Sequence, residues 1–79
     1  MKPSIGRIVL FGVDQSQRGN NNGGAVAPAI ITHVFSDTCV NLKVLTDGPV
    51  DLWHTSVLID DDPAAAVPAP SRWIWPPRV

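Results

Sequence analysis

The stretch TCVNLKVLTDGPVDLWHTSVLI, residues 38–59, carries the pattern that decides the fold. Its first half alternates apolar and polar side chains, as a strand with one buried face does. The apolar set is Val40, Leu42 and Val44, and the other set is Cys39, Asn41 and Lys43. The residues TDGP, 46–49, are typical of a turn, because Gly48 can adopt a positive φ. A second extended run over 50–59 completes a predicted β-hairpin.

Strict alternation in the second run divides its side chains between two faces. One face would carry Trp53, Thr55, Val57 and Ile59, and the other Leu52, His54, Ser56 and Leu58. Strands joined by a short turn pair with each other, so Asn41 is expected to lie near Trp53–Thr55 across the ladder.

Two further strands are predicted before this hairpin, over 4–13 and 25–35. The first is apolar on both faces, which favours a strand covered from two directions. Between them, DQSQRGNNNGG, 14–24, contains no apolar residue and is typical of a polar connecting loop. The alternative interpretation of this loop is a flap that closes over a ligand.

Short strands with close turns and no helical period predict an all-β fold. We expect a small antiparallel β-barrel, SH3-like or OB-like, with four to five strands. Residues 1–59 would form the barrel, residues 60–70 an Asp-, Pro- and Ala-rich linker, and residues 71–79 a tryptophan-containing tail. That tail is expected to dock on its own barrel or on a neighbouring one.

The chain of 79 residues is near the lower size limit for a stable single core. Cys39 is the only cysteine, so an intrachain disulfide cannot support the fold. Self-association is the remaining support, and we expect a homo-oligomer. Its predicted interface consists of Trp73, Ile74 and Trp75.

The charge and composition argue against several classes of partner. The formal net charge is −1 and the basic residues are scattered, so no nucleic-acid partner is expected. The N-terminus does not resemble a signal peptide and no apolar run is long enough to span a bilayer, so no membrane partner is expected. An unpaired thiol fits a reducing cytoplasm.

Neither a metal site nor a catalytic site is predicted, and no cofactor is expected. Cys39, His33 and His54 lack the paired spacing of a zinc site. The two histidines could act as bases, but no nucleophile elbow or paired glutamates accompany them. The three aspartates at 60–62 are more typical of a solvated turn than of a cation site.

A polar and aromatic patch is the predicted binding site. An outward amide and imidazole beside a large ring can hold a planar polar ligand, and an arginine can add a charge for a phosphate. The predicted ligand-binding residues are Asn41, Trp53, His54, Thr55 and Arg7. The alternative is that Trp53 fills the core and His54 is simply exposed.

Four segments of the chain resemble a family of short proteins encoded by tailed phages and prophages. These segments are PSIGRIV near the start, PAIITHVFSDTCVNLKVLTDG in the middle, LWHTSV, and WIWP near the end. The resemblance implies a phage origin and a place in the host bacterial cytoplasm. It implies no particular activity.

Two main hypotheses follow for function. In the first, the chain is a non-catalytic phage-encoded binding protein that acts in the infected bacterium. It would counter host defence by sequestering a small nucleotide-derived signal or by blocking a host protein. In the second, it is a head or tail accessory or assembly protein of the virion. A small enzyme is the least favoured interpretation.

Overall fold

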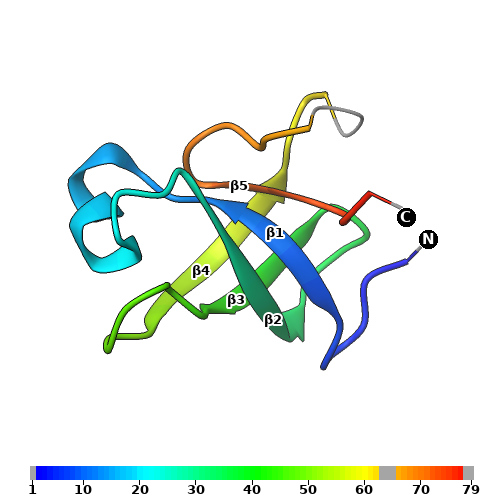
Figure 1. Cartoon of the computed structure of the whole chain (residues 1–79). Coiled ribbons are helices and arrows are strands. Elements are labelled where there is room, and N and C mark those ends of the chain that lie inside the picture. The colour runs from blue at the N-terminus through cyan, green and yellow to red at the C-terminus, as the bar shows by residue number, and fades with distance from the viewer. Residues whose placement is uncertain (1, 63–65, 78–79) are drawn as a thin grey trace.

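The computed structural model describes residues 2–62 and 66–77 as a closed barrel of five strands in the order β1-β2-β3-β4-β5 (Figure 1). The strands are β1 (Ile8–Gly12), β2 (Val26–Val34), β3 (Cys39–Val44), β4 (Leu52–Ile59) and β5 (Arg72–Ile74), and the short 3-10 helix η1 (Gln15–Asn21) joins β1 to β2. The predicted all-β fold, a small barrel of up to five strands, is therefore confirmed.

One strand pair differs from the expected antiparallel arrangement. β5 pairs in parallel with β4, through Leu58↔Arg72 and Ile59↔Trp73, and antiparallel with β1. The reason is where β5 begins: Ser71, the residue before β5, lies beside Gly12 at the end of β1, so β5 runs antiparallel to β1 and in the same direction as β4. There the Ser71 N–H donates to the Gly12 carbonyl at 2.8 Å. The barrel is thus mixed rather than wholly antiparallel.

Inward side chains from all five strands fill the barrel. The buried core consists of Val9, Phe11, Val13, Ala27, Ala29, Ile31, Val40, Leu42, Val44, Val57 and Trp73. The inward set predicted for 38–45 is confirmed in full. The expectation that the first strand is covered on both sides is wrong, because Ile8 is 46% exposed on the outer side of β1.

A β-bulge near Ser56 changes the faces predicted for β4. Ser56 adopts a φ of 54°, and the Asn41 side-chain Oδ1 accepts a hydrogen bond from its N–H at 2.8 Å. The inserted residue shifts the alternation by one position, so Val57 faces inward while Trp53 faces outward. The predicted common face of Trp53 and Val57 is therefore wrong.

The polar segment 14–24 is more ordered than the expected loop, because it contains η1. The Asp14 side chain accepts the Ser16 N–H at 3.1 Å at the start of the helix. Asn21 is buried near its end, and its Nδ2 donates to the carbonyls of Gly24 and Val26. Its Oδ1 accepts the Asp47 N–H at 2.7 Å, which fastens η1 to the β3–β4 turn.

The segment after β4 is held by Asp60. The Asp60 carboxylate accepts the Asp62 N–H at 2.8 Å and the Ala69 N–H at 2.6 Å. These bonds, with that from Ala69 first, lower the pKa of the Asp60 carboxyl below its ordinary value. Gly12 has no side chain where the Ala69 backbone crosses β1, and a Cβ there would collide with it. Residues 63–65 of the predicted linker lie outside the described residues.

The tryptophan tail closes the barrel of its own chain. Trp73 is fully buried, Ile74 is 1% exposed, and Trp75 is half-buried against the core. The Trp73 ring makes an edge contact with Trp75 and its Nε1 donates to the Thr38 carbonyl at 3.3 Å. A homo-oligomer interface through these residues stays a prediction, and it would require β5 to exchange between chains. Residues 78–79 lie outside the described part of the tail.

Replacing the barrel's largest buried side chain is the first test of this fold. Trp73→Ala is expected to lower the free energy of unfolding by about 3–5 kcal/mol, because it opens a cavity where β1, β4 and β5 meet. Urea unfolding followed by circular dichroism measures this change. Val67→Ala, at a side chain that is 55% exposed, is the control and should change stability little. Equal stability of the two variants would contradict a closed barrel filled by Trp73.

Candidate functional site

The outward side chains of the central strands form three rows across the barrel, which we call the outer face. The first row is Ile8, Ile30, Lys43 and Trp53; the second is His33, Asn41 and Thr55; the third is Phe35, Cys39, Leu58 and Arg72. The first and third rows are mainly apolar, and the row between them is polar. This face gathers most of the large apolar side chains that the strands leave outside the core.

Trp53 is the most exposed large side chain on the outer face. It is 59% exposed, because the bulge at Ser56 directs it away from the core. Lys43 is its cross-strand partner on β3, and Ile30 is the partner of Lys43 on β2. A cation thus lies between two apolar side chains, and neighbours of this kind interact across a sheet.

One side chain of the polar row, Asn41, has a structural role in the barrel. The Asn41 Oδ1 holds the bulge at Ser56, as described above, which leaves the amide Nδ2 without a hydrogen-bond partner among residues 2–62 and 66–77. His33 pairs with Asn41 across β2 and β3, and its ring meets Phe35 edge-on with centroids 4.6 Å apart. Phe35 is 55% exposed and extends the aromatic surface into the third row.

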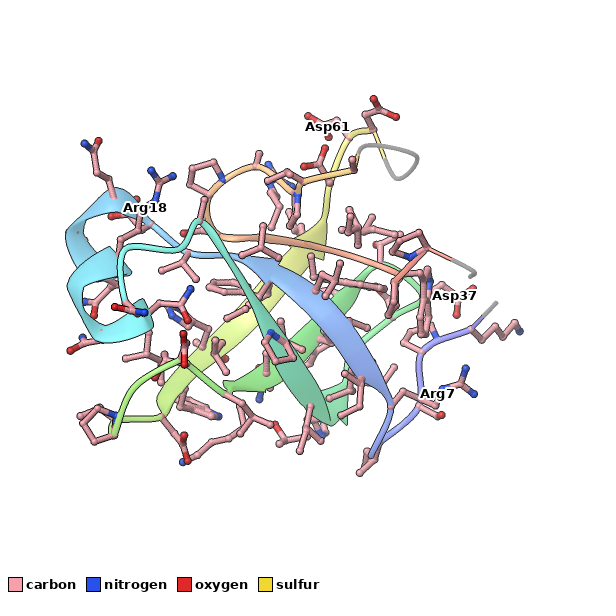
Figure 2. The ribbon with its side chains drawn as sticks, viewed as in Figure 1. Arg7, Arg18, Asp37 and Asp61 are labelled. Atoms are coloured by element: carbon pink, nitrogen blue, oxygen red, sulfur yellow. The ribbon has the colours of Figure 1, made fainter. Side chains whose placement is uncertain are left out.

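The structure brings together three of the five predicted ligand-binding residues. Asn41, Trp53 and Thr55 lie on the outer face, where Lys43 pairs with Trp53 and Asn41 accepts the Ser56 N–H. His54 lies on the opposite side of β4. Arg7 lies just before β1, as Figure 2 shows. Its guanidinium is 5.6 Å from the centroid of the Trp75 ring. It belongs to the surroundings of the tail rather than to the outer face.

His54 contributes to packing inside the barrel. Its ring lies 4.7 Å from that of Phe11, with the planes tilted by 33°. Burial of the imidazole lowers the pKa of His54 below its ordinary value of 6.5, because it disfavours the charged form. Packing in the folded protein therefore favours the neutral form of the His54 imidazole. The interpretation of His54 as simply exposed is wrong, since it is half-buried.

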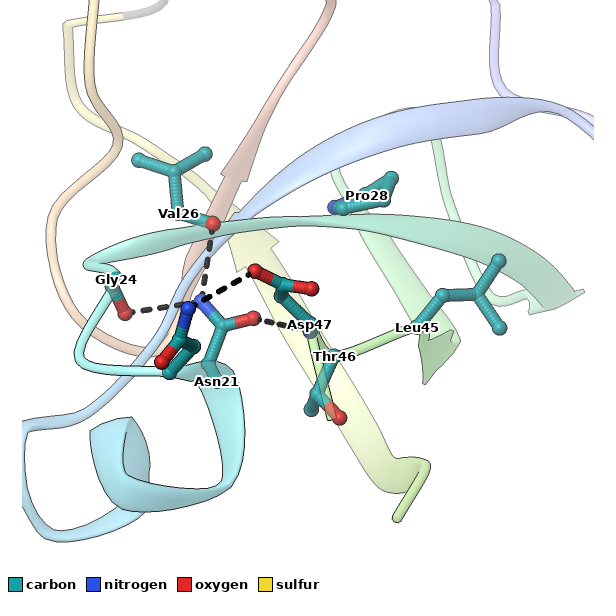
Figure 3. A pocket seen from close by; sticks show the side chains of 8 residues that line it. Asn21, Gly24, Val26, Pro28, Leu45, Thr46 and Asp47 are labelled. Carbon is teal, nitrogen blue, oxygen red and sulfur yellow. Dashed lines mark hydrogen bonds between the residues drawn. The ribbon is translucent and has the colours of Figure 1, made fainter. Parts of the chain in front are cut away.

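A hollow of about 390 Å³ continues the outer face toward η1 (Figure 3). Its apolar lining is Val26, Pro28 and Leu45, and its polar lining is Asn21, Asn22, Gly24, Thr46 and Asp47. Pro28 lies two positions before Ile30 on β2, and Leu45, just beyond the end of β3, lies two positions after Lys43 and donates its N–H to the Pro28 carbonyl, so the two surfaces adjoin. The sequence analysis missed this hollow because its wall depends on the packing of η1, and the signal was the run of asparagines at 20–22.

The side chains of the site suit binding better than acid–base chemistry. His33 and His54 lie on opposite sides of the sheet, so they cannot serve one reacting group. Within the described ranges, no three histidine, cysteine, aspartate or glutamate side chains are grouped so that they could hold a metal ion. Over the same ranges, no helix is long and apolar enough to cross a membrane.

Comparisons of the chain with protein-family models, with curated proteins and with solved structures each found no match. The function is therefore inferred from the geometry of the outer face and from the sequence itself.

The packing of His54 predicts a dependence of stability on pH. Its lowered pKa means that the unfolded chain binds a proton more readily, so stability should fall as the pH drops below about 6.5. Urea unfolding at about pH 7 and at about pH 5 measures this loss. His54→Gln should remove most of the difference, whereas His33→Gln, at an exposed imidazole, should retain it. If His54→Gln left the loss of unfolding free energy between about pH 7 and about pH 5 unchanged, the pH dependence could not be assigned to His54.

The hydrogen bond at the bulge predicts a structural role for Asn41. Asn41→Ala removes the acceptor of the Ser56 N–H and is expected to cost about 1 kcal/mol of stability. Asn41→Asp keeps an acceptor at this position and should cost less. Thermal unfolding of the two variants tests the difference, and a stable Asn41→Ala protein would show that the bulge does not need this bond.

Proposed function

We propose that the chain is a non-catalytic binding protein that captures a protein partner on its outer face. The observation that carries this proposal is the exposure of Trp53, a tryptophan that is 59% exposed beside Lys43. The resemblance to phage and prophage proteins suggests where the protein acts, which is inside an infected bacterium. In that setting, the partner is a host protein of the infected bacterium, and binding blocks its role in defence.

Exposed apolar side chains support a binding surface because they gather on one face. Trp53, Phe35, Leu58 and Ile8 are between 45% and 59% exposed, and all four belong to the first and third rows. Exposed apolar side chains that gather on one face of a small soluble domain mark an interaction site, and here a polar row lies between the two apolar rows. Tryptophan is also among the residues that contribute most to binding when a partner excludes water from it.

The geometry favours a protein over a nucleotide-derived signal as partner. A nucleotide site needs cations for its phosphates as well as a ring for stacking. Arg7, the predicted phosphate contact, lies beside Trp75, away from Trp53. The adjoining hollow is lined by the carboxylate of Asp47 and by no lysine or arginine. A broad face that carries the exposed aromatic side chains of Trp53 and Phe35 instead suits the surface of another protein.

The proposal predicts a binding defect when Trp53 is replaced. The partner would be identified by co-purification from infected bacteria, then purified and titrated with each variant. Trp53→Ser should weaken its binding by at least about tenfold without unfolding the barrel, because the side chain lies outside the core. Val67→Ser is the matched control, since Val67 is similarly exposed but lies outside the outer face.

Three outcomes would contradict the proposal. The first is equal binding of the partner by Trp53→Ser and the wild-type protein. The second is the presence of the chain in purified virions at stoichiometric amounts, measured by mass spectrometry, which would favour the virion component. The third is a thermal shift caused by cyclic or linear nucleotides and abolished by Trp53→Ser, which would favour sequestration of a small ligand.

A further inference from the structure

We infer that the outer face recognises a segment of its protein partner in which a carboxylate is flanked by aliphatic or aromatic side chains, and that Lys43 binds this carboxylate. The inference rests on the proposed function and adds the chemistry of the partner. The observations that carry it are the surroundings of Lys43 and the distribution of charge over the barrel.

Lys43 lies at the centre of the first row. Its cross-strand neighbours are Ile30 on one side and Trp53 on the other, and its own side chain is exposed. Among the residues that the structure describes, no carboxylate lies within ion-pair distance of its ammonium group. An acidic side chain from a partner would meet this charge while neighbouring apolar side chains covered Ile30 and Trp53.

The barrel separates its charges by position. None of the five strands contains an aspartate or glutamate, whereas Lys43 and Arg72 lie within strands. The seven acidic residues are all in the connecting segments, and Figure 2 shows two of them, Asp37 and Asp61, outside the strands. The outer face therefore combines two mainly apolar rows and one polar row with the basic residues Lys43 and Arg72, and its rows contain no carboxylate, which complements an apolar and acidic segment.

The same charges disfavour two other occupants. A second copy laid face to face would set Lys43 and Arg72 against a surface whose strands hold no carboxylate. Among the described residues of the outer face, a single-stranded nucleic acid would find Lys43, Arg72 and the imidazole of His33, with Asp37, Asp47 and Asp51 in the turns beside them. Few phosphates could be neutralised there, and phosphate contacts supply most of the affinity for nucleic acid.

Designed peptides provide a direct test with the full chain. One labelled peptide alternates glutamate with leucine, a second replaces each glutamate by lysine, and a third replaces each leucine by serine. Fluorescence anisotropy at low salt should show binding of the glutamate–leucine peptide at least about tenfold tighter than of the other two. Added salt should weaken that binding, because the ion pair is exposed.

A charge exchange at Lys43 makes the test specific. Lys43→Glu should weaken binding of the glutamate–leucine peptide by about tenfold and should make the lysine–leucine peptide the preferred one. Lys2→Glu is the matched control, because Lys2 is also exposed but precedes β1 and is not part of the outer face. It should leave the preference for the acidic peptide unchanged. Circular dichroism confirms that each variant is folded.

Three results would overturn the inference. They are equal binding of the acidic and basic peptides by the wild-type protein, an unchanged preference in Lys43→Glu, and tighter binding of an oligothymidine than of the acidic peptide. Self-association that depends on Lys43, detected by sedimentation, would assign the face to a second copy and would also overturn it. If the peptides fail while Trp53→Ser still abolishes binding of a purified host protein, only the chemistry of the segment is wrong and the proposed function holds.

Discussion

The burial of Trp73 between β1 and β4 is the contact on which the rest of the structure depends. β5 has only three residues, yet it joins the two ends of the sheet through two pairs on each side. A bare strand of this length gains little from its hydrogen bonds alone, whereas a fully buried tryptophan removes a large apolar area from water. The burial of Trp73 therefore contributes more to closing the barrel than the backbone pairing of β5 does. A single chain of this size obtains a filled core without a disulfide.

A filled barrel leaves only its outside for binding, and the bulge in β4 determines what that outside carries. With strict alternation, Trp53 and Val57 would share a face, and the ring would compete with Trp73 for space in the core. The extra residue at Ser56 separates them, so Val57 packs inward and Trp53 remains exposed. Asn41 holds this bulge and lies on the same outer face as Trp53, which links the fold to the candidate site.

The distribution of charge is the basis for the binding preference that we propose for this exposed surface. Carboxylates lie in the connections, where Asp14 caps η1 and Asp60 holds the segment before β5. The strands hold apolar and uncharged polar side chains, two histidines and the two basic residues Lys43 and Arg72, but no carboxylate. A net charge of −1 conceals this separation, because it sums over turns and strands alike. Position on the barrel, rather than total charge, is what supports an acidic and apolar protein segment as partner.

The sequence by itself determined the strands, the hairpin at 38–59, the all-β barrel and the inward set Val40, Leu42 and Val44, because alternation and turn residues act over a few neighbours. Only the tertiary structure decided the direction of β5, the inward position of His54, the separation of Arg7 from the outer face, and the hollow beside η1. Each of these depends on a contact between residues far apart in the chain. The bulge at Ser56 shifts the alternation of β4 by one position, and the segment after β4 makes β5 parallel to β4. Both features depend on tertiary packing, so the local pattern of apolar residues does not predict them.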